Sequence, residues 1–141
     1  MEETLVIIKP DGMKNIDNIL NILYKNNLKI KNYKLMKLDK DILHEHYSHI
    51  INESYYPEIE KHMTSGYVAV MIVEGINAIE KVRIIIGNTD SKIATKGTIR
   101  NMYGTDKTRN AIHASDSKEN AIIEIDRFFQ SNNKVLKLTN K

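Results

Sequence analysis

Cysteine is absent from this chain, and glycine and proline are scarce. Without cysteine the fold has no disulfides, thiolate metal sites or cysteine nucleophile, a composition that suits an intracellular protein. No glycines form GxxxxGK[ST] or GxGxxG, the motifs that bind phosphates through glycine-rich loops. They stand at Gly12, Gly66, Gly75, Gly87, Gly97 and Gly104. Any bound phosphate must therefore be held by side chains.

Long hydrophobic runs are missing as well. The N-terminal stretch "MEETLVIIKP" carries acidic residues where a signal peptide needs basic ones. Its apolar run is far shorter than the roughly 20 residues that a membrane-spanning helix requires. We therefore expect a cytoplasmic protein without a membrane segment.

Charge of one sign does not dominate. The 21 lysines and arginines are interspersed with 18 aspartates and glutamates, which leaves a net charge of +3. A surface dedicated to nucleic acid normally shows clustered basic residues. The pattern favours a solvated surface and no specific nucleic-acid partner, and it suits a small anionic ligand.

The length of 141 residues fits one domain with its own core, and no repeat or low-complexity block divides the chain. We expect a single domain over residues 1–141. Its tail, at about 131–141, either frays or lies along a neighbouring subunit.

Hydrophobic periodicity predicts strands over 4–9, 28–38, 67–75 and 110–114, and helices over 16–24, 40–49, 55–63 and 76–86. A last helix is capped by Asp116 or Ser117. Its predicted buried stripe comprises Ala121, Ile122, Ile125, Phe128 and Phe129. The order predicts an α/β (α+β) sandwich of the ferredoxin-like βαββαβ kind, with a four-stranded antiparallel sheet and an extra helical pair.

Residues 88–109 show no clear periodicity and form a predicted loop far longer than the ordinary connection of about 4 to 6 residues. Long ordered loops in small domains are usually functional, so we expect this loop to help build the active site. Three cations stand where such a site could use them, namely Lys9, Arg83 and Arg100. Each of them alone is more commonly a surface charge.

His113 lies in the short polar break "NAIHASDS", between small neighbours. A lone loop histidine is usually inert, but Glu124 falls at the edge of the predicted buried stripe, where a carboxylate seeks a donor. A carboxylate bonded to one imidazole nitrogen leaves the other free as a nucleophile, which can attack phosphorus. The alternative is that Glu124 caps its helix or pairs with Arg127 or Lys118.

The segment "HEHYSH" contains His44, His46 and His49 but is not HExxH. His44 and His46 point to different helix faces, so we expect a surface helix rather than a zinc site. Tyr55 and Tyr56 begin the next predicted helix, where a ring could stack on a base, although a core aromatic is the commoner role.

Together these segments resemble the nucleoside diphosphate kinase family. The matching blocks are "TLVIIKPDG", "HY" at 46 and 47, "MTSG", "GNT", "KGTIR" and "RNAIHASDS" followed by Glu124. They occur in the family's order and at nearly its spacing across almost the whole chain. The resemblance implies transfer of the γ-phosphate of ATP, or of another nucleoside triphosphate, to a nucleoside or deoxynucleoside diphosphate. It also implies a ping-pong route through phosphohistidine, with Mg²⁺ bridging the nucleotide phosphates.

The resemblance also assigns roles to residues of this chain. His113 would be the nucleophile, phosphorylated at its pros nitrogen. Glu124 would orient it, held in turn by Ser115. Supporting, phosphate-binding and ribose-binding roles would fall to Lys9, Tyr47, Arg83, Thr89, Arg100 and Asn110. Tyr55 and Ile59 would form the base slot, and Asp116 would reach Mg²⁺ through water. Because stacking accepts every base, such a slot implies low base selectivity.

Two further readings of the chain remain. An RNA-binding module shares the βαββαβ order, but it needs exposed aromatic residues on the strand face, where this chain has Ala69 and Met71. A catalytically silent nucleotide-binding member of the family would lack reacting groups, yet every reacting position is occupied. The resemblance also implies a homo-oligomer, with a hexamer favoured over a tetramer or dimer. Departures from the family pattern gather in and around the long loop, as at Ser91 and Lys96.

Overall fold

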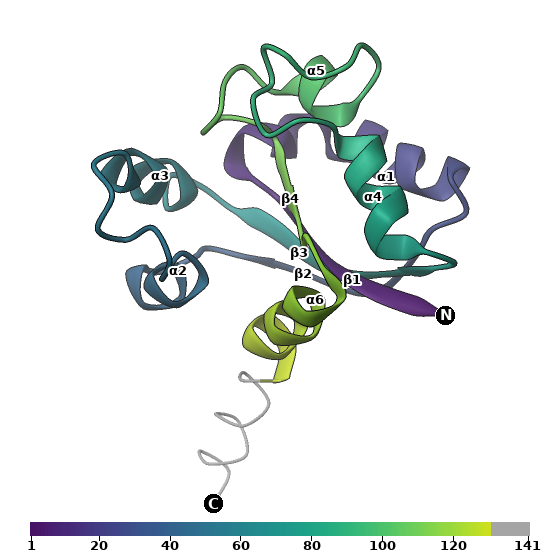
Figure 1. The fold of residues 1–141 in the computed structure, drawn as a ribbon, viewed down its shortest axis with the longest axis horizontal. Helices are drawn as coiled ribbons and strands as arrows, with labels where there is room; N and C mark the ends of the chain where they lie inside the picture. The colour runs from purple at the N-terminus through teal and green to yellow at the C-terminus, as the bar shows by residue number, and fades with distance from the viewer. Residues whose placement is uncertain (131–141) are drawn as a thin grey trace, which may run out of the picture.

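The computed structural model describes residues 1–130 and contains a four-stranded sheet in the order β2-β3-β1-β4 (Figure 1). Its strands are β1 (Glu2–Ile8), β2 (Lys29–Met36), β3 (Val68–Gly75) and β4 (Ile112–Ala114). Every neighbouring pair is antiparallel. The α+β ferredoxin-like fold predicted from the element order is confirmed.

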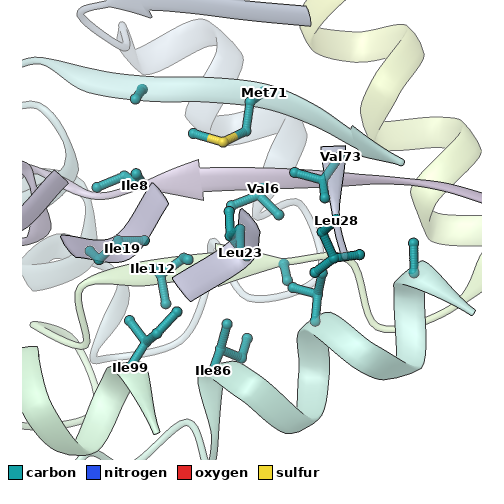
Figure 2. Close-up of a cluster of buried hydrophobic side chains, with 14 residues drawn as sticks. Val6, Ile8, Ile19, Leu23, Leu28, Met71, Val73, Ile86, Ile99 and Ile112 are labelled. Carbon is teal, nitrogen blue, oxygen red and sulfur yellow. The ribbon is translucent and has the colours of Figure 1, made fainter. Parts of the chain in front are cut away.

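Strand β1 forms the centre of the molecule because its apolar residues are buried on both faces of the sheet. Leu5, Val6, Ile7 and Ile8 are all fully buried. Successive side chains of a strand point to opposite faces. Val6 and Ile8 accordingly join one core cluster, shown in Figure 2, and Leu5 and Ile7 join another on the opposite face.

Helices α1 (Ile16–Lys25) and α4 (Ala78–Ile86) cover the first face, where they contribute Leu23 and Ile86 to the larger cluster (Figures 1 and 2). The opposite face is covered by α2 (Lys40–His46), α3 (Tyr56–Met63) and the C-terminal helical segments. Those segments are α6 (Lys118–Ile125) and the π-helical turn η2 (Asp126–Gln130). A short 3-10 helix, η1 (Pro10–Asn15), joins β1 to α1.

The predicted long loop contains a helix that periodicity did not reveal. Helix α5 (Ile99–Tyr103) has five residues, and Thr98 caps it by accepting a hydrogen bond from the backbone N–H of Asn101. Such a helix is too short to display a full apolar stripe. It brings Ile99 into the core and buries Arg100 beside β4.

The C-terminal helical prediction was partly wrong. Ser117 is the N-cap, as one of the two alternatives held, but Ile122 is 64% exposed and does not belong to the buried stripe. The α-helix ends at Ile125 and continues as a π turn, in which Phe128 is fully buried in the core. The predicted tail at 131–141 lies outside the described residues. Among residues 1–130, no helix is long and apolar enough to cross a membrane.

Candidate active site

A cavity of about 1050 Å³ opens between the end of β1, strand β4, helices α2 and α3, and the segment that follows α4. All residues predicted for the site line it except Ser115, which is fully buried and bonded to Glu124. Chain segments far apart in the sequence therefore meet around one space large enough for a nucleotide.

His113 is the central residue of strand β4. It is paired with Ile7 of β1, so its side chain points to the same face of the sheet as Ile7. Its Nε2 lies 2.9 Å from Glu124 Oε1, and Ser115 Oγ donates to the same oxygen at 2.6 Å. Nδ1 forms no hydrogen bond within residues 1–130. The ring is thus held through one nitrogen and open at the other.

Glu124 carries the charge that orients this ring. Burial alone would raise its pKa, but hydrogen bonds from His113 and Ser115 outweigh that effect and hold the pKa well below its usual range. The carboxylate is therefore ionised at neutral pH. The alternative pairing with Arg127 or Lys118 does not occur, because both hydrogen bonds of the carboxylate go to strand β4 and the residue after it.

The backbone before His113 is fixed by Asp11, a residue that the sequence patterns did not single out. Ala111 adopts a left-handed conformation with φ of 73°, which is unfavourable for a residue with a Cβ. Its N–H donates to Asp11 Oδ2 at 2.9 Å, and its carbonyl accepts from the Lys9 N–H at 2.9 Å. Asp11 Oδ1 in turn lies 2.9 Å from His62 Nε2 of α3. The turn after β1 therefore braces the start of β4.

Lys9 and Arg100 are buried cations, so the surface-charge alternative is wrong for both of them. Burial and the nearby Arg100 lower the pKa of Lys9 to about 8. Arg100 donates to the carbonyls of Ile112 and Gly87, and burial lowers its pKa to about 10. Arg83 is exposed at the cavity wall, as the alternative held. The cavity thus concentrates positive charge from three separate elements.

Asn110 is almost fully buried at the cavity wall. Its Nδ2 donates to the carbonyls of Thr89 and Lys107, both at 3.0 Å. Its Oδ1 is buried without a protein partner among the described residues. Since buried polar atoms are nearly always paired, this oxygen at the cavity wall is a candidate acceptor for a donor of a bound ligand.

The aromatic residues of α2 and α3 divide between the cavity and the core. Tyr55 is 51% exposed and lines the cavity with Ile59, whereas Tyr56 is buried in the protein. The core role considered for this tyrosine pair therefore holds for Tyr56, and Tyr55 is placed where a stacking role is still a prediction. Tyr47 also lines the cavity, and burial raises the pKa of its hydroxyl, which therefore keeps its proton at neutral pH.

His46 does not lie on a surface, so the expectation of a surface helix is wrong at this position. Its side chain is only 2% exposed and packs edge-on against the ring of His113. His44 and His49 do remain exposed. The sequence did contain a sign of this burial, because Leu43 and His46 are three residues apart and therefore lie on the same face of α2.

A family model for nucleoside diphosphate kinase matches residues 2–134. The chain belongs to the nucleoside diphosphate kinase family. It is 43% identical to the nucleoside diphosphate kinase of Acetivibrio thermocellus, over 92% of this chain and 96% of that protein. It is 42% identical to that of Saccharolobus islandicus, over 92% of this chain and 95% of the relative. The resemblance inferred from the motifs is confirmed.

Solved structures agree. The nucleoside diphosphate kinase of Aquifex aeolicus superposes with a TM-score of 0.84 at 39% identity, covering 91% of this chain and 94% of that one. The Halobacterium salinarum enzyme, solved in complex with CDP, gives a TM-score of 0.87 at 37% identity, covering 91% and 87%. The chain is accordingly a phosphotransferase that moves the γ-phosphate of a nucleoside triphosphate to a nucleoside diphosphate.

One cluster in this kinase has the residue types of a metal site. Potential ligand atoms of His46, His113 and Glu124 all lie within 4.8 Å of one another. However, the Arg127 guanidinium points at His46 Nδ1 from 2.9 Å, and Glu124 Oε1 already faces two donors. A guanidinium bonded to a would-be ligand disfavours a second cation there. The cluster is better described as a hydrogen-bonded and packed network around His113.

Proposed function

We propose that His113 is the nucleophile of this nucleoside diphosphate kinase and carries the phosphate between the two substrates. The observation that supports this role most is the bond of its Nε2 to Glu124, which leaves Nδ1 as the free nitrogen on the cavity wall. The Nδ1 lone pair attacks the γ-phosphorus, and the bond to the β–γ bridging oxygen breaks. The nucleoside diphosphate then leaves with that oxygen.

Glu124 compensates the positive charge that the imidazole ring gains in this step. The proton stays on Nε2 and continues to point at the carboxylate, so no proton transfer is needed. The second half-reaction reverses the first, because a terminal oxygen of another diphosphate attacks the phosphohistidine and His113 Nδ1 departs. Ser115 keeps the carboxylate in place throughout through its 2.6 Å hydrogen bond.

The phosphates would be held by side chains, as the lack of a glycine-rich loop requires. Lys9 and Arg100 supply charge from the floor of the cavity, and Arg83 and Thr89 supply donors from its wall. Tyr47 adds a hydroxyl from α2. Positioned positive charge stabilises the charge that shifts between phosphorus and its oxygens during transfer.

The nucleoside would lie between α3 and the end of the long loop. The unpartnered Oδ1 of Asn110 is an acceptor for a ribose hydroxyl. Tyr55 offers a ring to one side of the base, and Ile59 provides an aliphatic contact. Because these contacts are stacking contacts, purine and pyrimidine nucleotides should both bind.

Mg²⁺ would arrive with the nucleotide phosphates. Among the described residues, Asp116 and Glu124 are the carboxylates that line the cavity. Glu124 is engaged by strand β4, whereas Asp116 is exposed and bonded to Asn120 through Oδ1. Asp116 is therefore the residue that would hold the ion through water. When bound, Mg²⁺ supplies positive charge at the phosphate oxygens.

We also expect a homo-oligomer, with a hexamer favoured over a tetramer or dimer. Large apolar side chains on several elements are exposed in the single chain. Examples are Leu35, Ile76, Ile84 and Ile122. Light scattering at micromolar concentration would measure the assembly, and a monomeric mass would contradict the expectation.

The decisive experiment is to incubate the purified protein with Mg²⁺ and γ-labelled ATP. We expect an acid-labile, base-stable phosphoprotein that loses its label to GDP or dTDP. His113→Ala should take up no label while keeping its thermal unfolding temperature. A label that survives this substitution, or that does not pass to the diphosphate, would contradict the proposed mechanism.

A further inference from the structure

Arg127 lies directly behind the reacting residues, although it does not line the cavity. It belongs to η2, the π turn that follows α6. Its guanidinium NH1 is 2.9 Å from His46 Nδ1, and its side chain is only 12% exposed. On its outer side, Nε lies 3.5 Å from the exposed Glu45. A buried cation is thus aimed at a buried histidine.

This contact determines the protonation state of His46. A guanidinium is always a donor and never an acceptor, so His46 Nδ1 must be an unprotonated acceptor. The ring is therefore neutral, with its proton on Nε2. Its position is further fixed by the rings of Tyr47, His113 and Phe128, whose centroids lie 4.8, 4.7 and 5.3 Å away.

The neutral ring matters because of what lies next to it. Glu124 Oε2 is 4.0 Å from the same His46 Nδ1 that Arg127 occupies. If Nδ1 carried a proton, it would be a donor facing this carboxylate. His46 would then compete with His113 for Glu124, and a charged His46 would face the ring that itself becomes positive during phosphorylation.

We propose that Arg127 is a positioning residue for phosphoryl transfer: by occupying Nδ1 of His46, it keeps that ring neutral and reserves Glu124 for His113. This inference rests on the proposed role of His113 as nucleophile. Arg127 touches neither substrate nor the reacting nitrogen, and it acts only through His46.

The surroundings of His46 agree with this assignment. Charged or titratable groups face it from β4, α6, η2 and the end of β1. They are His113, Glu124, Arg127 and Lys9. Burial is the largest cause that lowers the pKa of His46, His113, Arg127 and Lys9 add to it, Glu124 opposes it, and together these effects bring the pKa to about 3. Loss of Arg127 would remove an opposing charge and expose Nδ1 to the one group that favours its protonation.

The test compares Arg127→Met, which keeps an apolar stem, with Arg127→Lys, which keeps a positive donor. Lys31→Met is the matched control, because it removes an exposed cation from β2 that pairs with Glu3. Histidine ¹⁵N chemical shifts report the tautomer of His46 in the unliganded protein. Rapid-quench labelling with γ-labelled ATP between pH 5.5 and 9 reports phosphorylation of His113.

We expect Arg127→Met to move the proton of His46 to Nδ1, or to protonate both nitrogens, and to slow phosphorylation roughly tenfold at pH 8, the loss expected when a buried hydrogen bond to a charged group is removed. The defect should grow as the pH falls, and Arg127→Lys should recover most of the rate. Lys31→Met should match the unmodified protein.

An unchanged tautomer in Arg127→Met would overturn the inference, as would a slower rate that is independent of pH and follows only the loss of folded protein in circular dichroism. If Arg127→Met does not fold, Arg127→Lys provides the test. A native His46 tautomer and a native phosphorylation rate in this variant would support the inference. A changed His46 tautomer with a native rate would overturn it. Failure of the unmodified protein to label His113 would instead contradict the proposed nucleophile.

Discussion

The two faces of the sheet differ in what their cores contain. The face under α1 and α4 is filled by one continuous apolar cluster that includes Val6, Ile8 and Leu23. The face under α2, α3 and α6 has a smaller apolar cluster around Leu5 and Ile7, and next to it a buried polar network. The first cluster contains only apolar side chains. The second face combines stability with the alignment of the site, so substitutions on the two faces should have different consequences.

The largest effect should come from cavities in the two cores. Leu23→Ala in α1 and Leu43→Ala in α2 each truncate a fully buried side chain, and each should lower the free energy of unfolding by about 2 to 5 kcal/mol. Leu23→Ala should leave the rate of His113 phosphorylation within twofold. Leu43→Ala should slow it, because Leu43 lies one turn before His46 on α2.

Urea unfolding and rapid-quench labelling below the unfolding transition would measure these two quantities separately. If both variants lost the same fraction of the phosphorylation rate, the two faces would not differ in their effect on the site, and the prediction would be wrong.

Lys9→Met should have opposite effects on stability and activity. Below pH 8 the protonated lysine is buried at a cost, because its pKa in the folded state is about 8 against an ordinary value of 10.5. Because the pKa of Lys9 is lower in the folded state than in the unfolded state, folding carries the full cost of burying the charge below pH 8. This cost decreases as the pH rises and disappears above pH 10.5. We therefore expect the variant to gain on the order of 2 kcal/mol at pH 7 and to lose most of its phosphotransfer.

The pH dependence provides the check on this prediction. The stability advantage of Lys9→Met should shrink between pH 8 and 10.5 in urea unfolding. A variant with Lys31→Met, which removes an exposed lysine, should show no such advantage. Reduced stability of Lys9→Met at pH 7 would show that the lysine contributes more through its contacts than it costs through burial.

Glu124→Gln should change the acid side of the stability curve. The pKa of Glu124 is lowered in the folded state, so its ionised form stabilises the fold above the ordinary pKa of 4.5, and this contribution is lost as the pH falls through the lower value. The amide variant should therefore be less stable than the unmodified protein at pH 7, with a difference that shrinks toward acid. Phosphorylation should be slowed roughly tenfold because a neutral amide stabilises the imidazolium less.

Thermal unfolding from pH 3 to 7 would follow this difference, with Glu119→Gln, an exposed acid on the same helix, as the control. A constant stability gap across that range would mean that the charge of Glu124 is not what stabilises the site.

The smallest effect should come from Tyr55→Phe. The ring is 51% exposed at the cavity wall, and its hydroxyl makes no hydrogen bond within residues 1–130. Stacking depends on the ring, so kcat/KM for purine and pyrimidine diphosphates should change less than about twofold. Tyr55→Ala should reduce kcat/KM for every base. A change confined to one base in the phenylalanine variant would reveal a specific contact from the hydroxyl.

The sequence was most informative where one local period governs the structure. Strand β1 reads as a short β-branched run before Pro10, and α1 begins at Ile16 as its apolar spacing predicts. The motifs and their spacing predicted that His113 and Glu124 interact, and in the structure His113 Nε2 lies 2.9 Å from Glu124 Oε1.

Features that depend on contacts between distant segments could not be read in this way. His46 and Arg127 are separated by 81 residues, and no local pattern pairs them. A helical wheel placed Ile122 in the buried stripe, yet Ile122 lies within α6 and is 64% exposed, because the face that a helix buries depends on what it packs against. The role of Asp11 could not be predicted from local patterns either, because its partner is the distant backbone N–H of Ala111 and not a side chain that belongs to a motif.

The brace between Asp11 and Ala111 joins residues 100 positions apart, and a Cβ on the intervening turn at Gly12 would collide with the carbonyl of Ala111. The same contact sets when the protein becomes competent during its synthesis. A ribosome-bound chain that has emerged only as far as α5 contains Lys9, Tyr47 and Arg100. It lacks strand β4, whose backbone accepts hydrogen bonds from Arg100 and whose preceding residue, Ala111, accepts one from Lys9. Nucleotide capture by nascent chains of increasing length should therefore begin only after β4 has left the exit tunnel.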